Sequence, residues 1–176
     1  ASTHIIAALS SVPELLGNFF QLFSSNLLHH FKDRKKIILF FSFLQALVWL
    51  PILLIPYLFW KSVYVLIVLV TLHSAFNLIQ APIWNSMMGD LVPENRRGEF
   101  FGQRNKIIGM ASFYATLIAG ITLSIFSNNN NIFIGFSILF GTACITRLGA
   151  TFFKSLHYNP PLDLDKEEPF SLWQFI

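Results

Sequence analysis

Two long stretches of this sequence contain no Asp, Glu, Lys or Arg, and they limit the possible folds more than any other feature. They run from Ser62 to Gly89 and from Ile107 to Thr146. A helix crosses the hydrocarbon core of a bilayer with about 20 residues, so both stretches are long enough to span a membrane. Only 12% of the whole chain is charged and 54% is hydrophobic, whereas soluble domains are about one-quarter charged. The sequence therefore predicts an integral membrane protein whose first partner is the lipid bilayer.

The apolar segments favour helices over the strands of a membrane barrel. They lack a sustained alternation of apolar and polar residues, and they greatly exceed the roughly 9–11 residues of a barrel strand. The predicted fold class is all-α, a polytopic membrane helical bundle with five transmembrane helices. Residues 1–157 are expected to form this bundle, and residues 158–176 a cytoplasmic linker. The five predicted spans cover about residues 5–31, 37–60, 63–86, 107–126 and 132–153.

The basic residues alternate between the two sides of the predicted bundle. Residues 32–36 contain four Lys or Arg residues, and residues 87–106 contain four more, whereas the connections at 61–62 and 127–131 contain one between them. Under the positive-inside rule, the loops at 32–36 and 87–106 and the C-terminal tail are expected in the cytoplasm, below the inner or plasma membrane. The same rule puts Ala1 outside, so we expect a further span upstream. The net charge of +3 is explained by this topology and requires no nucleic-acid partner.

Polar residues inside the first and third predicted spans fall on one face of each helix. They recur at intervals of four, three and four residues, which keeps them within an arc of about 60° at 100° per residue. An ionised group at mid-bilayer costs about 2.5–3.5 kcal/mol or more, so these faces should avoid lipid. They either form interhelical hydrogen bonds or line a water-filled pathway. Ser25 completes the polar face of the first span, and the candidate pathway residues are Glu14, Asn18, Gln21, His73, Asn77, Gln80 and Trp84.

Other chemically active residues within the spans are few. Arg147, near the inner end of the fifth span, either reaches the cytoplasmic interface by snorkelling or serves as a functional charge. Cys144 is the single cysteine, so this stretch has no disulfide or cysteine-based zinc framework of its own. The adjacent His29 and His30 are interpreted as the polar end of a span, and the sequence has no GxxxxGK[ST] phosphate-binding loop. We therefore predict no catalytic residues, no metal and no cofactor, and a protein that is not an enzyme.

The charged segment at residues 87–106 resembles part of a known family. It contains PENRRG at 93–98, preceded by GD at 89–90 and followed by FG at 101–102 and RN at 104–105. A Pro-Glu pair followed by Arg-Gly at this point resembles the loop after the fourth helix of major facilitator superfamily transporters. On this register the chain is similar to helices two to six of the first six-helix half, plus the start of the central linker. The resemblance implies a fragment without the first helix and the second half.

The first basic loop departs from the pattern of that family. The family has a carboxylate ahead of its basic residues, between two glycines, and this chain has none at those positions. The basic end of the pattern is retained at Arg34 and Lys35, and we expect Asp33 or Asp90 to serve as the carboxylate partner instead, of which we favour Asp90. The residues that replace the family's Gly, Asp and Gly are Ser25, His29 and Lys32.

The resemblance implies a secondary transporter that moves a small solute by alternating access, with or without a coupling ion. Ionic contacts at the cytoplasmic ends of the helices would open and close as the two halves rock. It is equally open that these charges only anchor helix ends and set the topology. The residues themselves are also compatible with a membrane-embedded enzyme, a lipid-handling protein or a structural membrane subunit. The implied gate residues are Arg34, Asp90, Glu94, Arg97 and Arg104.

Overall fold

The structure, a computed structural model, describes residues 3–55, 57, 63–129 and 131–161. All regular secondary structure in these residues is helical, which confirms the predicted all-α class. Most of the predicted linker at 158–176 lies outside the described residues. The elements are α1 (Thr3–Gln21), α2 (Ser24–Phe31), α3 (Arg34–Leu54), α4 (Val63–Leu91), the 3₁₀ turn η1 (Glu94–Arg96), α5 (Arg97–Asn128) and α6 (Ile132–Ser155).

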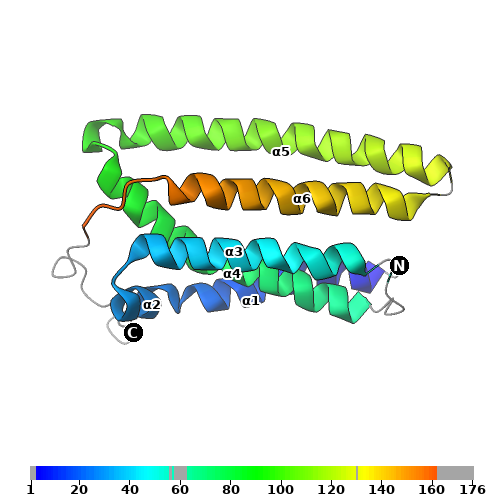
Figure 1. Cartoon of the computed structure of the whole chain (residues 1–176), viewed down its shortest axis with the longest axis horizontal. Coiled ribbons are helices and arrows are strands. Elements are labelled where there is room, and N and C mark those ends of the chain that lie inside the picture. The colour runs from blue at the N-terminus through cyan, green and yellow to red at the C-terminus, as the bar shows by residue number, and fades with distance from the viewer. Residues whose placement is uncertain (1–2, 56, 58–62, 130, 162–176) are drawn as a thin grey trace.

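α3, α5 and α6 lie nearly parallel along the long axis of the molecule, and α4 runs obliquely behind them (Figure 1). α1 packs on α4, and α3 packs on both α4 and α6. α5 packs mainly on α6, and its apolar side chains are largely exposed, as expected for surfaces that face lipid or further helices. The α2–α3 turn, the α4–α5 connection and the end of α6 share one end of the bundle. We call this the basic end (residues 32–36, 92–106 and 154–161), because it gathers the basic segments that the sequence assigns to one side.

The prediction of one continuous helix over residues 5–31 was wrong. α1 ends at Gln21 and α2 begins at Ser24, with a turn at Leu22 and Phe23 between them. The amides of these two turn residues donate to carbonyls three residues back, at 3.2 and 3.1 Å, so the chain tightens and changes direction. The turn lets α2 lie against α3 and α4 with Ser24 and Leu28 buried. Within the described residues four helical segments are long and apolar enough to cross a membrane, close to the predicted five.

The charged segment at residues 87–106 is mostly helical, and the prediction of a loop there was wrong. α4 continues to Leu91 and α5 begins at Arg97, so residues 92–96 alone connect the two helices. Glu, Arg, Lys and Gln are good helix formers, and nothing in this segment but Pro93 interrupts a helix. With 32 residues, α5 is about 48 Å long and therefore extends well beyond a hydrocarbon core of about 30 Å.

The predicted loop at residues 32–36 is likewise shorter in the structure. Lys32 adopts a left-handed conformation (φ 52°) and ends α2, and Asp33 then caps α3. The Asp33 carboxylate accepts a hydrogen bond from the Lys36 backbone amide at 3.1 Å, which satisfies one of the free donors of the first helical turn. The turn therefore holds the start of α3, including Arg34, in a fixed position at the basic end.

Two close contacts between helices help to position polar residues. At the contact between α1 and α4, a Cβ on Gly17 would lie 2.6 Å from Leu78 Cδ1 and 3.4 Å from the Ser74 backbone, so the missing side chain allows a close approach. Near the basic end, an apolar cluster holds α2, α3 and α4 together. Its buried members are Leu28, Ile37, Ile38, Ile83, Met87 and Met88.

Candidate functional site

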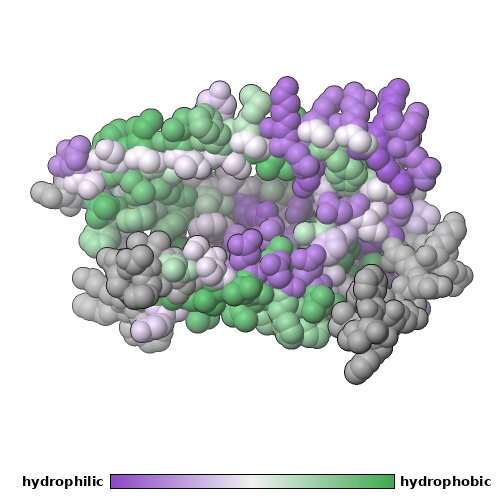
Figure 2. Space-filling model, turned by 180° about the vertical axis from the view of Figure 1, so that it is seen from behind, coloured by the Kyte–Doolittle hydropathy of each residue, from purple (hydrophilic) through white to green (hydrophobic). Residues whose placement is uncertain are grey.

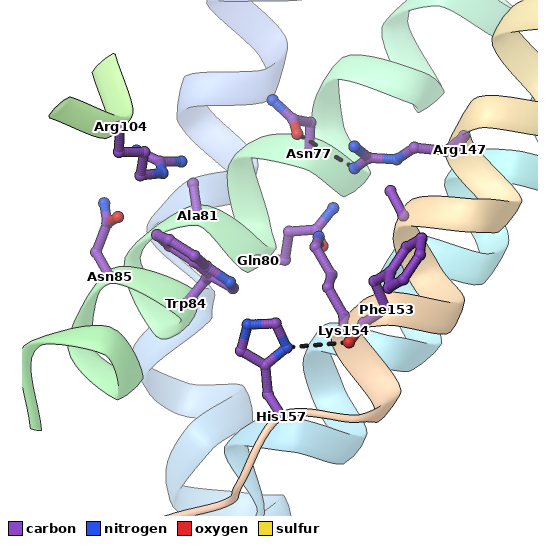
Figure 3. A pocket seen from close by; sticks show the side chains of 11 residues that line it. Asn77, Gln80, Ala81, Trp84, Asn85, Arg104, Arg147, Phe153, Lys154 and His157 are labelled. Atoms are coloured by element: carbon purple, nitrogen blue, oxygen red, sulfur yellow. Dashed lines mark hydrogen bonds between the residues drawn. The ribbon is translucent and has the colours of Figure 1, made fainter. Parts of the chain in front are cut away.

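A cavity of about 470 Å³ opens between α4, α5 and α6 (Figure 3). α4 contributes a polar face with Asn77, Gln80 and Trp84, which recur at helical spacing. α6 contributes Arg147 and Lys154, which are seven residues or about two turns apart and therefore share a face. The volume is that of a small-molecule site, for which about 300–1,000 Å³ is usual.

Basic side chains dominate the cavity, and each is held by neutral groups. Arg147 donates from Nη2 to Asn77 Oδ1 at 3.5 Å, and its buried Nε has no hydrogen-bond partner among the described residues. Lys154 donates from Nζ to Gln80 Oε1 at 3.0 Å. The Arg104 guanidinium carbon lies 4.4 Å from the centroid of the Trp84 ring, a cation–π contact. The residues that line this cavity in the described part of the chain include no Asp or Glu.

The floor of the cavity is tied to α3 by buried hydrogen bonds. Ser42 donates to Gln80 Oε1 at 2.5 Å, and Gln80 Nε2 donates to Gln45 Oε1 at 3.0 Å. Lys154 Nζ also donates to Ser42 Oγ at 2.9 Å. Ser42, Gln45 and Gln80 are almost fully buried, so this network joins α3, α4 and α6 inside the bundle, where hydrogen bonds are stronger than in water.

The remaining residues of the predicted pathway occupy different surroundings. His73 faces α3, where Gln45 Nε2 donates to its Nε2 at 3.1 Å and its ring packs edge-on against Trp49. Glu14 and Asn77 line a second cavity of about 310 Å³ between α1 and α4. Asn18 is exposed and Gln21 is half-buried on α1. Asn77 lines both cavities, so it is the residue at which the two polar faces come together.

An ion pair joins the start of α3 to the end of α4 at the basic end. Arg34 Nη1 contacts Asp90 Oδ2, which is the pairing favoured from the sequence. The Arg34 side chain is 4% exposed and that of Asp90 is 48% exposed, so the carboxylate remains open to solvent on one side. Glu94 and Arg97 form a second pair, with 3.6 Å between Oε1 and Nη1. Arg104, the fifth predicted gate residue, lies in the cavity against Trp84.

A hydrogen bond to the Asp33 carboxylate fastens the segment after α6 to the α2–α3 turn. Partial burial by itself raises the pKa of Asp33. Hydrogen bonds from the Lys36 amide and ammonium, the charge of that ammonium and a hydrogen bond from Asn159 lower it by more. The pKa therefore lies below its usual 3.8. Asn159 Nδ2 donates to Asp33 Oδ1 at 3.2 Å. Asp33 is therefore ionised at neutral pH and pins the end of the described chain to the basic end.

Three residues that shape the site do not stand out in the sequence. Lys154 looks there like a charge after the last span, and Ser42 and Gln45 are isolated polar residues of the second. Two signals point to them all the same: Lys154 follows Arg147 by two helical turns, and Ser42 and Gln45 are three residues apart in an apolar helix. Among the described residues, no group of three or more His, Cys, Asp or Glu side chains is arranged to hold a metal ion.

Comparison with known proteins gives one match. The family model described as Major Facilitator Superfamily matches residues 1–176 of the chain. No curated protein and no solved structure matches significantly. On the face seen in Figure 2, apolar side chains cover much of the coloured surface, while hydrophilic ones gather at one end and inside a central hollow.

Proposed function

Because the chain belongs to the major facilitator superfamily, we propose that it is part of a secondary transporter that moves a small solute by alternating access. The family is one of membrane transporters, and the four long apolar helices among the described residues make this chain an integral membrane protein. In the proposed orientation the basic end faces the cytoplasm of the cell's inner or plasma membrane, as the excess of Lys and Arg at that end favours.

The observation that carries the mechanism is the Arg34–Asp90 pair. It ties α3 to α4 at the basic end, and we propose that Asp90 exchanges Arg34 for a cation of the second half when the two halves rock. Arg34 is buried and is therefore stabilised by its carboxylate partner. Asp90 is open enough to solvent to exchange Arg34 for another cation. The pair is thus suited to a latch that is closed in this structure and open in the opposite state.

The exposed pair beside this latch supports the same interpretation. Glu94 is 88% exposed and Arg97 43% exposed, and the distance between their charged atoms is 3.6 Å. Such pairs contribute about 0–1 kcal/mol, so exchanging one for another costs little. Arg97 Nε also donates to the Val92 carbonyl at 3.3 Å, which holds its guanidinium over the α4–α5 connection. We propose that Glu94 and Arg97 are exchangeable contacts of the gate.

The two cavities supply a route for the solute. One is lined by Glu14 and the other by Arg147 and Lys154, and Asn77 lines both. We assign the polar faces of α1 and α4 to this route. Glu14 is the carboxylate on it that is able to exchange a proton, so it is the candidate for coupling to a proton gradient.

The test is uptake by the full-length protein in sealed proteoliposomes, measured for a panel of labelled solutes with and without a proton gradient. We expect uptake of at least one solute, a large reduction in its rate by Asp90→Asn, and partial recovery in the exchanged variant Arg34→Asp/Asp90→Arg. Glu99→Gln is the matched control, because Glu99 is an exposed carboxylate at the basic end whose bond is to neutral Gln103.

Two results would count against the proposal. If Asp90→Asn transports at the wild-type rate with equal amounts of protein in the membrane, the pair is not a latch. If no solute of the panel is taken up under any gradient by correctly inserted protein, the transport assignment for this chain fails.

A further inference from the structure

The cavity between α4, α5 and α6 brings together three cations without a neutralising carboxylate among its described lining residues. Arg104 comes from α5, and Arg147 and Lys154 come from α6 (Figure 3). The groups that hold them are neutral: side-chain oxygens of Asn105, Asn77, Ser42 and Gln80, and the Trp84 ring. In the described part of the chain, ion pairs form elsewhere, at Arg34, Lys36 and Arg97.

This arrangement is costly unless an anion enters it. Arg147 and Lys154 lie on a helix that spans the membrane, and both are partly buried, so their charges have lost much of their hydration. Amide and hydroxyl oxygens compensate only part of that loss, and like charges on neighbouring helices repel one another. A bound oxoanion would restore the balance and would give the buried Arg147 Nε the acceptor it lacks among the described residues.

An apolar cavity of about 380 Å³ adjoins the cationic one. The two cavities share Trp84, Arg104 and His157, so one ligand can occupy both. The walls of the second are mostly apolar and include Met88, Phe100, Ile107 and Ile108. A ligand that fits the pair has a negatively charged head and an apolar body.

We propose that this double cavity binds an organic anion, with its phosphate or carboxylate group between Arg104, Arg147 and Lys154 and its apolar part along α5. The guanidinium groups of Arg104 and Arg147 present forked N–H donors that suit the oxygens of a phosphate or carboxylate. The Trp84 ring holds the Arg104 guanidinium in place. If the bound anion is the transported solute, this inference rests on the transport function proposed above, and it names the substrate class of the transporter. A phospholipid headgroup has the same chemistry, and the experiment distinguishes the two sources.

The first measurement is binding of phenyl phosphate to the full-length protein in phosphatidylcholine nanodiscs, by calorimetry, with benzyl alcohol as the neutral counterpart. We expect phenyl phosphate to bind and benzyl alcohol to bind much more weakly. Hydrogen bonds to charged groups are worth enough that Arg147→Gln or Lys154→Gln should each weaken binding by about 10- to 100-fold. Arg104→Gln should do the same, and because Arg104 lies outside the buried network this variant tests the site even if the other two do not fold.

Lys106→Gln is the matched control, because it removes one exposed charge from the same helix two residues away and should leave binding unchanged. The second measurement is the lipid that copurifies with the protein and its exchange between phosphatidylcholine and phosphatidylglycerol nanodiscs. Enrichment of phosphatidylglycerol that the three pocket variants abolish would identify a lipid headgroup as the anion.

The proposal is overturned if phenyl phosphate does not bind and phosphatidylglycerol is not enriched, or if Lys106→Gln weakens binding as much as the pocket variants do. The anion site and the transport assignment can fail independently of each other. Uptake of a neutral or cationic solute without anion binding would refute the anion site alone. Anion binding without uptake of any solute would refute the transport assignment and leave the site in place.

Discussion

Gln80 is the centre of the buried network that joins α3, α4 and α6, so replacing it with Leu tests how the bundle is held together. Its side chain is 2% exposed and takes part in three hydrogen bonds, with Ser42, Gln45 and Lys154. Leu is similar in size and removes all three. Hydrogen bonds between transmembrane helices average about 0.6 kcal/mol and reach about 1.7 kcal/mol. We therefore expect Gln80→Leu to lower the free energy of unfolding by about 2 kcal/mol, with an upper limit of about 5 kcal/mol.

The assay is reversible unfolding of the full-length protein in mixed micelles, followed by circular dichroism. Gln103→Leu is the control, because Gln103 is exposed and hydrogen-bonds only to Glu99 in the described structure. Its effect should stay within about 0.5 kcal/mol. Combining Ser42→Ala with Gln80→Leu should give less than the sum of the single effects, since both remove the same bond. A Gln80→Leu effect no larger than that of the control would refute the view that this network stabilises the bundle.

Three further predictions concern packing, pH and the gate. Gly17→Ala should be tolerated, because the flexible end of Leu78 can turn away, whereas Gly17→Leu should separate α1 from α4 and cost about 1–3 kcal/mol in unfolding experiments. Asp33→Asn should be less stable than wild type at neutral pH; because the folded-state pKa of Asp33 is lowered, this difference should shrink in unfolding titrations as the pH falls below about 3.8, and a constant difference would argue against it. Arg97→Ala should slow solute uptake with membrane levels unchanged, and unaltered uptake would leave the Glu94–Arg97 pair without a gating role.

Long uncharged runs were enough to predict the helical membrane fold, because a helix satisfies its own backbone within a bilayer and these runs are too long, and alternate too little, for barrel strands. Helix ends were less predictable. The charges of the segment at 87–106 favoured a loop, although those residue types also form helices well and α5 simply continues past the lipid. The break at Leu22 and Phe23 has no Gly or Pro to mark it, and depends on how α2 packs against α3 and α4.

The candidate site was partly predictable in the same way. Helical spacing identified the polar face of α4, but it did not tell which members face a cavity and which face another helix. Trp84 lies in the cavity, whereas His73 bonds to α3, because neighbouring helices meet α4 at different heights. Lys154 and Gln45 contribute through contacts between segments far apart in the sequence, so their spacing from Arg147 and Ser42 shows a shared helix face but not which residues that face meets.

The proposed transport mechanism depends most directly on which residues share one side of the membrane. In a full-length protein in which Cys144 and every other native cysteine are replaced by Ser, single substitutions Asn95→Cys and Ser127→Cys would be labelled in intact cells with a membrane-impermeant maleimide. Both positions are exposed in the structure, one at the α4–α5 connection and the other at the opposite end, near the end of α5. We expect label at residue 127 in intact cells, and at residue 95 only after the cells are made permeable. Label at residue 95 in intact cells, or at both positions, would contradict a cytoplasmic basic end and the transport mechanism built on it.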